Sequence, residues 1–462
     1  MITYLSILLF ILCVTLPVFH LINCLPFFSK KYKRYLQNEV KVFKGLSIII
    51  PCYNEENVIN TAISGMQRIE YENKEVIYVN DGSTDETFTL LTNLLDLRHL
   101  YIRPARKLKY KEVEGFYFSN KFKNTYVINK RNGGKADALN SGIDYSTKEV
   151  VITLDADSIL DTKALDVINQ VFQDENVIAA GGMVHVLQGK EFETGTHVRQ
   201  NMKLKNIIRL QMLEYLKGFY INKYSLAKSK ALAIISGAFG VFDKEILFNV
   251  GGYRHTVGED IDITLRFQRY IFEHKDKKMV FAPEAICYTE CPENWSDLFK
   301  QRVRWQKAFI DCIFKYHKML IGTFLVRRVS FFFLLDAFIV GTASIFVAVY
   351  WSGVFLVDSY FGNIPYVLLL ASLTMNLTYN VIAIFLAKHY GTKFHKTDKS
   401  RLLLTVLLDS FVFRFIIMFY TLFGTLTYFV NKKDWNKVKR TGRLYNFEKV
   451  IQVDKIIEVN AD

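Results

Sequence analysis

The segment "VITLDADSIL", residues 151–160, joins a short apolar run to two acidic residues. Val151 to Leu154 predict a strand buried on both faces of a parallel sheet. Asp155 and Asp157 follow one residue apart, and residues i and i+2 of a strand point to the same side, so we expect both carboxylates to reach one object. Oxygen ligands with open positions suit Mg²⁺ or Mn²⁺ completed by phosphate oxygens. The alternative is a turn in which each carboxylate accepts a backbone N–H.

Similar strand patterns, each followed by a helical pattern, surround this segment. The predicted strands are residues 46–51, 75–81, 125–129 and 149–155, and the predicted helices are residues 55–68, 85–96 and 136–144. Apolar strands that alternate with helices predict an α/β fold with a mixed, mostly parallel sheet covered on both faces. Ligands of such sheets bind at the carboxyl ends of the strands. Polar clusters follow three of the strands there, at residues 54–56, 81–83 and 155–157.

Two glycine-containing turns carry the next candidate residues. In "VNDGSTDET", residues 79–87, Asp81 ends a strand and is free to accept hydrogen bonds from a base or a ribose, whereas Thr84 or Asp85 caps the next helix. In "KRNGGKADALNSG" a Gly-Gly turn places Lys135 before a helix. A helix N-terminus and a lysine together favour an anionic group such as a diphosphate.

Acidic residues also open a later helix. The string "VGEDIDITLRF", residues 257–267, places Glu259, Asp260 and Asp262 in a first turn, where carboxylates complement the helix dipole. That role accounts for Asp262. Glu259 and Asp260 follow a glycine turn and form a candidate general base, because a carboxylate near a cleft can accept a hydroxyl proton. The small residues of "SGAFGVF", 236–242, suit a pocket floor beneath a flat ligand or plain close packing.

The string "QRVRWQKA", residues 301–308, combines arginine and tryptophan on one helix. Gln301, Arg304 and Trp305 lie at positions i, i+3 and i+4 and therefore share a face. Arginine suits diphosphate recognition, and the face of a tryptophan suits a sugar ring. The same string also fits an amphipathic helix on a membrane surface, with arginines that snorkel and an interfacial tryptophan. Both interpretations can hold, because different faces would serve them.

Long apolar runs indicate a membrane protein. The runs are residues 4–27, 330–357, 363–387 and 402–430. The first is long enough to span a bilayer and lacks the small-residue site that ends a cleaved signal peptide. The basic string "KKYKR" directly after it places that end in the cytoplasm. We expect an N-terminal span (1–30), a cytoplasmic domain (35–325), membrane helices (330–430) and a basic tail (431–462).

Charged residues inside the apolar runs bear on topology. Asp409 and Arg414 are costly in lipid, and a single crossing by residues 402–430 would put the Lys-rich tail outside, against the positive-inside rule. A hairpin or an interfacial element instead returns the tail to the cytoplasm. We therefore expect a bent or re-entrant element and a cytoplasmic tail. Asp336, about a turn and a half into an apolar run, either faces a polar lumen or is hydrated near the cytoplasmic end.

Composition narrows the class of partner. Lys and Arg outnumber Asp and Glu by 59 to 45 in 462 residues, of which 50% are hydrophobic. A basic excess on an apolar chain indicates anionic lipid or an anionic small substrate. Nucleic acid is disfavoured, because the basic residues are spread out and no nucleic-acid motif is present. The 6 Cys form no C-x-x-C pair, which disfavours zinc and indicates reduced thiols.

Taken together and in order, these strings resemble the motifs of the family 2 glycosyltransferases, specifically the membrane-embedded processive polysaccharide synthases. That group makes cellulose, chitin, hyaluronan and poly-N-acetylglucosamine. The resemblance covers residues 45–310 and the flanking spans and implies a GT-A-type nucleotide-sugar domain. The chain departs from the family in showing one N-terminal span instead of two. Only residues 431–462 follow the last apolar run, which disfavours a typical bacterial cellulose synthase and favours the poly-N-acetylglucosamine type.

The resemblance assigns roles to the acidic candidates. It implies that Asp81 contacts the uracil-ribose part of a UDP-sugar. It implies that Asp155 and Asp157 contact the nucleotide and a divalent metal, Mg²⁺ or Mn²⁺. The base is then Asp260, next to Glu259.

The resemblance also implies that Gln301, Arg304 and Trp305 line the diphosphate and acceptor site. The implied activity is inverting, processive transfer from a UDP-sugar, with UDP-N-acetylglucosamine expected, to a polysaccharide exported through the plasma membrane. Partners are then the bilayer, the polymer and an accessory membrane subunit. The alternatives are a synthase that uses another UDP-sugar, transfer of one sugar to a lipid phosphate, and a catalytically silent membrane subunit or channel.

Overall fold

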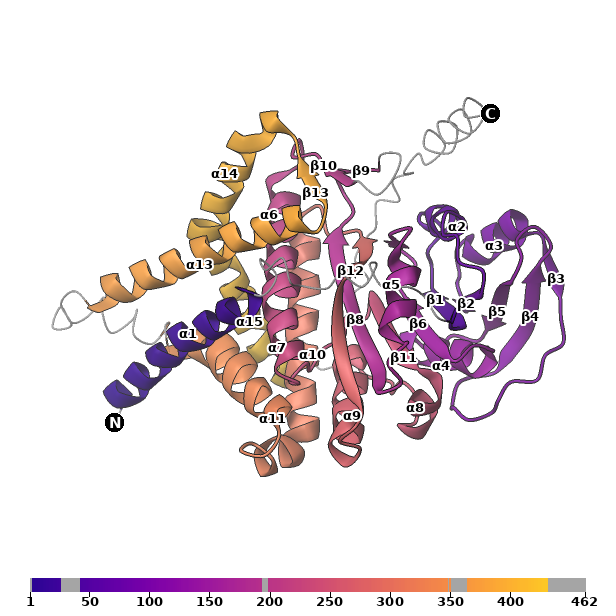
Figure 1. Cartoon of the computed structure of the whole chain (residues 1–462), viewed down its shortest axis with the longest axis horizontal. Coiled ribbons are helices and arrows are strands. Elements are labelled where there is room, and N and C mark those ends of the chain that lie inside the picture. The colour runs from indigo at the N-terminus through magenta and orange to yellow at the C-terminus, as the bar shows by residue number, and fades with distance from the viewer. Residues whose placement is uncertain (1, 26–41, 193–197, 348, 350–363, 431–462) are drawn as a thin grey trace.

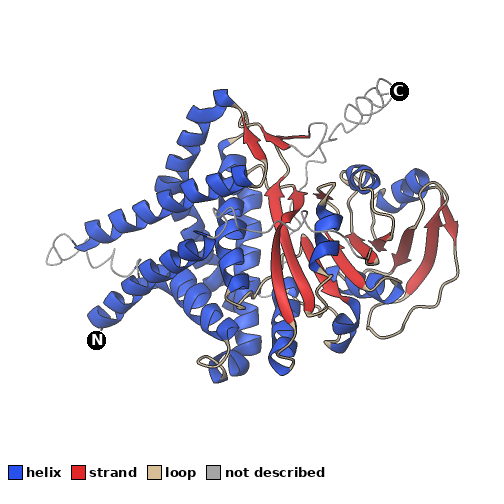
Figure 2. Ribbon diagram, in the orientation of Figure 1, coloured by secondary structure: helices blue, strands red, loops and turns tan. Residues whose placement is uncertain are grey.

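The computed structural model describes residues 2–25, 42–192, 198–347, 349 and 364–430. The string "KKYKR" and the predicted tail, residues 431–462, lie outside the described residues. A sheet flanked by short helices forms one side of the molecule, and longer helices form the other (Figures 1 and 2). This arrangement confirms the predicted α/β domain with an attached helical region.

One large sheet organises the α/β domain. Its strands are β1 (Leu46–Cys52), β2 (Lys74–Asp81), β3 (Leu97–His99), β4 (Val113–Ser119), β5 (Thr125–Lys130), β6 (Val150–Leu154), β7 (Ser158–Leu160), β8 (Val177–Val186), β11 (Phe239–Asp243) and β12 (Lys278–Thr289). They follow the order β3-β4-β5-β2-β1-β6-β11-β8-β12-β7.

The four strands predicted from the sequence are the adjacent strands β5, β2, β1 and β6, and all three pairings among them are parallel. The only other parallel pairing described in this sheet joins β8 and β12. Its remaining pairings are antiparallel. The predicted mixed sheet is confirmed, with a larger antiparallel share than expected.

Helices cover both faces of the sheet. They are α2 (Ile59–Gln67), α3 (Thr87–Leu95), α4 (Lys135–Tyr145), α5 (Ala164–Val171), α8 (Lys244–Asn249) and α9 (Glu259–Glu273). Alternate residues of β1 belong to the two apolar cores on opposite faces of the sheet. Ile48 and Ile50 share one core with α2 and α5, and Ile49 shares the other with α4 and α9. A strand with apolar residues on both sides, as the sequence predicts, is therefore buried on both sides.

A second group of helices lies between the sheet and the longest apolar helices. It comprises α6 (Asn206–Leu216), the π-helix η3 (Lys217–Lys223), α7 (Tyr224–Lys228) and α10 (Trp295–Gly322). Helix α10 begins where the Asn294 side chain accepts a hydrogen bond from the Asp297 N–H at 2.9 Å. Charged residues recur along α10, which suits a surface between protein and membrane better than a crossing.

The remaining helices contain the apolar runs. They are α1 (Ile2–Cys24), α11 (Arg328–Phe332), η4 (Phe333–Ala343), α13 (Ile364–His389), the short η6 (Lys396–Asp398), α14 (Lys399–Leu408), η7 (Asp409–Phe413) and α15 (Arg414–Val430). Within the described residues, three helices are long and apolar enough to cross a membrane, namely Arg328–Val347, Leu370–His389 and Lys399–Val430. The last of these is one unbroken helix with a π-helical segment, so a re-entrant hairpin at residues 402–430 is wrong.

A small sheet links the two halves. Strand β10 (Val198–Gln200) pairs with β9 (Lys190–Phe192) and, in parallel, with β13 (Thr392–Phe394). Because β13 lies between α13 and α14, the C-terminal region contributes a strand to the domain predicted as residues 35–325.

The charged residues of the apolar runs have protein partners. Asp336 Oδ2 lies 2.9 Å from His20 Nε2 of α1, which neither predicted environment of Asp336 included. Asp409 is buried and pairs with Lys217 Nζ at 2.5 Å. The Arg414 guanidinium donates to the Ser372 carbonyl at 2.9 Å. Whether Asp336 also borders a polar lumen stays a prediction.

Candidate active site

Three of the predicted site residues, Lys135, Asp155 and Glu259, meet at the carboxyl end of β6. Lys135, the first residue of α4, places its ammonium 2.7 Å from Asp155 Oδ1 and 3.3 Å from Glu259 Oε1. Asp155 directly follows β6, and Glu259 is the first residue of α9. Three segments that are far apart in the sequence therefore meet at one cation.

Burial and the neighbouring charges have opposite effects on the pKa of Lys135. Burial lowers the pKa of Lys135, but the carboxylates of Asp155 and Glu259 outweigh it and raise that pKa above its ordinary value. Burial raises the pKa of Glu259, with Lys135 opposing and Asp260 adding to the rise. The lysine is therefore held as the ammonium ion, while Glu259 ionises less readily than a glutamate in water.

Asp260 lies beside this group. Its Oδ1 accepts the Ile261 N–H at 2.8 Å, and its Oδ2 accepts the Gly237 N–H at 3.4 Å. A Cβ at Gly237 would lie 3.1 Å from Lys135 Nζ and 3.6 Å from Asp260 Cβ, so the Gly237 backbone lies against both side chains. The "SGAFGVF" segment thus forms one wall of the site, in agreement with its pocket-floor interpretation.

Asp262 has a different environment from its neighbours. It is fully buried, and its carboxylate pairs with Arg254 at 2.7 Å and Arg266 at 2.8 Å. The Tyr316 hydroxyl donates to it at 2.7 Å. The structural role that the sequence assigned to Asp262 is supported, although the reason is ion pairing rather than the helix dipole alone.

Asp81 does not have the open carboxylate that the sequence predicted. Lys130 Nζ lies 2.6 Å from its Oδ1, and the backbone N–H groups of Gly133 and Gly134 donate to the two oxygens at 3.0 and 2.7 Å. Asp85 does bind the start of α3, accepting the Thr87 N–H at 3.0 Å. Asp81 thus shapes the glycine turn that precedes Lys135, and it is only 2% exposed.

The two carboxylates of the D-x-D string have separate surroundings. Strand β6 ends at Leu154, and residues 156–157 form a turn, so the strand alternation used to align them does not apply. Asp155 binds Lys135, whereas Asp157 Oδ1 accepts from the Ser158 and Thr289 hydroxyls at 3.3 and 3.4 Å.

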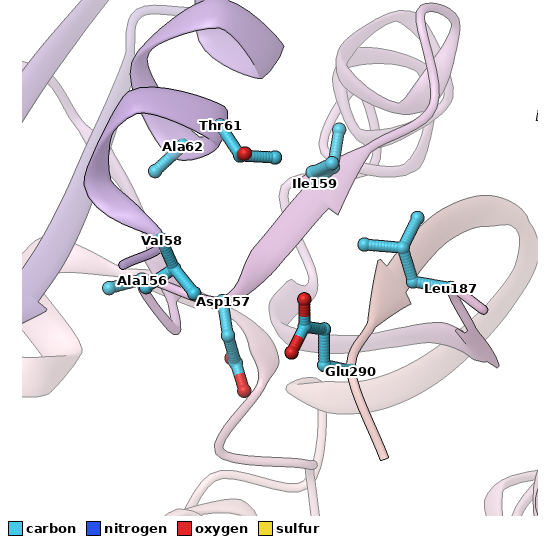
Figure 3. Close-up of a pocket in the computed structure, with 8 residues that line it drawn as sticks. All are labelled: Val58, Thr61, Ala62, Ala156, Asp157, Ile159, Leu187 and Glu290. Atoms are coloured by element: carbon cyan, nitrogen blue, oxygen red, sulfur yellow. The ribbon is translucent and has the colours of Figure 1, made fainter. Parts of the chain in front are cut away.

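Asp157 borders a small hollow in which Glu290 lies beside it (Figure 3). The hollow is lined by Val58, Thr61, Ala62, Ala156, Asp157, Ile159, Leu187 and Glu290. Within the part of the chain that the structure describes, no three His, Cys, Asp or Glu side chains lie close enough to hold a metal ion alone. A carboxylate facing a hollow fits a divalent cation whose other ligands come from a bound phosphate.

The "QRVRW" string forms a group on α10. Gln301 Oε1 accepts from Arg302 at 2.5 Å, and the Arg302 guanidinium stacks 4.2 Å from the Trp305 ring centroid. Arg302 also pairs with Glu214 of α6 at 2.6 Å. Trp305 remains 42% exposed and so keeps a free ring face. Arg304 is half-buried on the same helix.

Sequence reasoning missed several residues of this region. Lys130 could have been found, because it ends the strand that pairs with β2 and stands opposite Asp81 in register. Glu290 and Arg302 gave no separate signal. Lys223 of η3 also gave no signal in the sequence. Burial lowers the pKa of Lys223 to about 8, although the negative charge of Asp260 acts in the opposite direction.

Comparison with known proteins bears on what this geometry does. The family model "Glycosyl transferase family 2" matches residues 47–235, and "Glycosyl transferase family group 2" matches residues 150–431, more than half of the chain. The chain belongs to glycosyl transferase family 2. The matched segments include Lys135, Asp155 and Asp260, so the family match covers the site described above.

Curated relatives of this glycosyltransferase carry the name poly-beta-1,6-N-acetyl-D-glucosamine synthase. One from Staphylococcus epidermidis is 28% identical over 286 residues, 61% of this chain and 58% of the relative. One from Staphylococcus aureus (strain MSSA476) is 28% identical over 304 residues, 64% of this chain and 63% of the relative. The match thus spans less than two thirds of these relatives.

One solved structure is similar over 87% of this glycosyltransferase and 99% of its own chain. It is the mannosyltransferase PcManGT from Pyrobaculum calidifontis in complex with GDP-Man and Mn²⁺, with 16% sequence identity and a TM-score of 0.49.

Proposed function

We propose that this chain transfers a sugar from a UDP-sugar to a growing polysaccharide, with inversion at the anomeric carbon. The observation that carries the proposal is the meeting of Lys135, Asp155 and Glu259, with Asp260 beside them, at the carboxyl ends of the strands. A fixed cation next to an accessible carboxylate suits a reaction in which an anion leaves and a hydroxyl loses its proton. The expected donor is UDP-N-acetylglucosamine, in keeping with the names of the curated relatives.

The described residues divide the chemistry between them. The ammonium of Lys135 binds the diphosphate, which competes with Asp155 and Glu259 for it. Asp260 accepts the proton of the acceptor hydroxyl while the new C–O bond forms opposite the breaking bond to UDP. Asp157, with Asp155 near the nucleotide, would hold Mg²⁺ or Mn²⁺, which neutralises charge on the departing diphosphate. Trp305 offers a ring face to an acceptor sugar.

Repeated transfer with export through the plasma membrane, from a cytoplasmic catalytic domain, completes the proposal. It is supported by the apolar helices and by α10, whose Asp311 accepts from the Thr256 hydroxyl just before Glu259 and Asp260. A polymer-binding helix at the membrane boundary favours a synthase over an enzyme that loads one sugar onto a lipid phosphate. An accessory membrane subunit is compatible with this arrangement.

Reconstituted full-length protein tests the proposal. Proteoliposomes receive radiolabelled UDP-sugars one at a time, and UDP release and product size are measured. We expect one donor to give UDP and a long water-soluble polymer. A single labelled sugar in the organic phase would indicate the lipid-phosphate alternative. No UDP release with any donor would refute the enzyme and favour a silent subunit.

A further inference from the structure

The helix from Lys399 to Val430, formed by α14, η7 and α15, is unusually long for a membrane span. Its 32 residues at 1.5 Å each extend about 48 Å, beyond a hydrocarbon core of about 30 Å. Length and composition alone allow it to cross. The contacts of its two ends and of its middle decide whether it crosses the membrane.

The beginning of this helix is held on the catalytic domain. Just before it, β13 pairs in parallel with β10. Asp398 Oδ2 accepts the Met202 N–H at 3.0 Å, and His395 Nε2 lies 3.1 Å from Glu191 Oε2. These partners belong to segments next to β8 and α6, so the start of α14 lies on the catalytic side of the molecule.

The end of the helix is held on the same domain. The Tyr428 hydroxyl donates to Asp311 Oδ1 at 3.1 Å, and Asp311 Oδ2 accepts from the Thr256 hydroxyl at 3.2 Å. Thr256 stands four residues before Asp260. Phe314 also stacks on Tyr428, with ring centroids 5.8 Å apart. Both ends of the helix therefore contact the catalytic domain.

Between its ends the helix runs parallel to α10. Moving forward along both helices, Trp295 meets Phe413 at 6.4 Å, Phe299 meets Tyr420 at 5.1 Å, and Gln306 donates to Thr425 at 3.0 Å. Figure 1 shows this helix crosswise to α13 and α1.

Helix α10 cannot lie across the hydrocarbon, because its polar side chains bind α6 and the catalytic helix α9. Arg302 pairs with Glu214 at 2.6 Å near one end, and Tyr316 donates to Asp262 at 2.7 Å near the other. A helix that packs along α10 over this length therefore keeps the orientation of α10. Gly424 makes the packing close, since a Cβ there would lie 2.8 Å from Gln306 Cβ.

The outward face of the helix is strongly apolar. Every fourth residue from 403 to 423 is exposed by 39% to 61% and forms what we call the Leu/Phe stripe: Leu403, Leu407, Phe411, Phe415, Phe419 and Phe423. Leu404, Val412, Leu426 and Phe429 beside the stripe are also exposed, so the apolar face is broad. An exposed apolar face on a helix whose other face packs on protein is the pattern of a helix lying in a membrane interface.

We propose that residues 399–430 lie along the membrane surface with the Leu/Phe stripe in the boundary between headgroups and acyl chains, and do not cross. The Leu/Phe stripe contacts the lipid bilayer, because the helix follows the candidate membrane span Leu370–His389 in the sequence. The candidate span Arg328–Val347 also starts at the catalytic domain, where the Arg327 guanidinium stacks 3.7 Å from the Phe272 ring centroid. Two crossings between residues 328 and 389 then return the chain to that side, and Val430 stays there.

Probe depth in proteoliposomes tests the proposal. Only Cys13 needs replacement, because the other five cysteines are buried. Leu407, Phe415 or Phe423 is changed to Cys and carries a fluorophore, which is quenched by lipids with nitroxides at shallow or deep positions. We expect depths that agree within about 5 Å, although the helix advances about 24 Å from residue 407 to 423.

Helix α13 supplies the matched control. Leu370→Cys and Phe385→Cys, at positions 66% and 57% exposed, are separated by a similar axial length and should differ in depth by about 20 Å. Depths along the stripe that change as they do on α13 would overturn the proposal. So would a stripe that no lipid nitroxide quenches but that cross-links between two copies of the chain. Variants are compared only if they elute as one species and melt at the wild-type temperature.

Sidedness gives a second measurement. Val430→Cys, at a position 87% exposed, should resist an impermeant maleimide in intact cells and react in inverted vesicles. Labelling in intact cells would place Val430 outside and contradict the proposal.

Discussion

At the scale of single residues, Lys135 links the donor side of the candidate site to the base side. It binds Asp155, which directly follows β6, and Glu259, which precedes Asp260. A diphosphate that takes over Lys135 leaves both carboxylates with less positive charge near them. Donor binding is thereby coupled to the proton affinity of the residues that face the acceptor.

Replacing Asp260 tests its role as the base. Asp260→Asn keeps the shape but removes the proton acceptor, so transfer should fall by about 10²–10⁴-fold. Binding of UDP, measured by calorimetry, should stay within a few-fold of wild type. Asp276→Asn, an exposed carboxylate beyond the end of α9, is the control and should leave both values unchanged. A parallel loss of binding and rate would make Asp260 a ligand or structural residue.

Replacing Asp157 tests the metal. Asp157→Asn should reduce transfer to background, and a chelator should silence wild-type protein until Mg²⁺ or Mn²⁺ is restored. Mn²⁺ bound to the protein with UDP, followed by electron paramagnetic resonance, should disappear in the variant. Full activity in excess chelator would contradict the prediction.

Lys190 makes stability depend on pH. It is buried, with its ammonium 3.2 Å from His185 Nδ1, and burial lowers its pKa to about 7 against the weaker effect of Asp161. An unfolded lysine titrates near pH 10.4. Between pH 7 and 10 the unfolded chain therefore holds a proton that the folded chain lacks, and stability rises with pH by at most about 1.4 kcal/mol per unit.

Thermal melting in detergent from pH 7 to 10 measures this rise. Lys190→Met should melt at a higher temperature than wild type at pH 7 and should show a flatter pH dependence. Lys107→Met, which removes an exposed lysine, should keep the wild-type slope. An unchanged slope in Lys190→Met would show that another group causes it.

The site residues were predictable where polar side chains follow parallel strands. The topology brings Lys135 and Asp155 together, because each follows a strand of the parallel part of the sheet. Asp260 was proposed from a glycine turn that opens a helix, and its role as the base stays a prediction. The environment of Asp81 was not predictable, because its partners Gly133 and Gly134 are backbone donors that no side-chain pattern marks. The assumption that Asp157 continues a strand failed, because residues 156–157 form a turn.

At the scale of elements, one ion pair joins η3, in the group of helices next to the sheet, to the long apolar helix that contains η7. Lys217 begins η3, Asp409 begins η7, and Asp409 Oδ2 also accepts from Asn376 and Asn380 of α13 at 3.0 and 2.8 Å. Asp409 and Arg414 thus sit in an otherwise apolar run because they have partners, and not because the chain turns back there.

Lys217→Met should destabilise the protein by about 3–5 kcal/mol, because it leaves the buried Asp409 carboxylate without its cation. The double variant with Asp409→Leu should recover most of the loss. Arg269→Ala, which breaks an exposed pair with Glu273, should cost at most about 0.5 kcal/mol. Equal stabilities of the single and double variants in detergent would contradict this account.

The elements predicted from the sequence are those with strong local patterns. The four buried parallel strands and the helices after them agree with the structure within a few residues. Strands β8, β11 and β12 escaped prediction, because each alternates or interrupts its apolar residues and pairs with a strand distant in the sequence. The contact of α15 with α10 depends on Gly424 and a set of aromatic rings, which carry no local signal.

At the scale of the whole molecule, we expect the catalytic domain and the C-terminal helices to fold as one unit, because they share a sheet and a helix packing. A chain that ends at residue 325, the predicted domain boundary, lacks β13 and the helix that covers α10. We expect such a chain, measured by size-exclusion chromatography and melting, to aggregate without detergent and to melt at a lower temperature than the full chain in detergent. A monodisperse fragment with wild-type UDP binding would show that the domain is independent.

The parallel pairing of β10 with β13 has a consequence for biosynthesis. Residues 198–200 leave the ribosome almost two hundred residues before their partner strand, residues 392–394, is translated. The catalytic domain cannot complete its small sheet until the helix of residues 364–389 and β13 after it have been translated. In the topology proposed above, that helix must first be inserted and return the chain to the same side, so membrane insertion would precede the last step of domain folding.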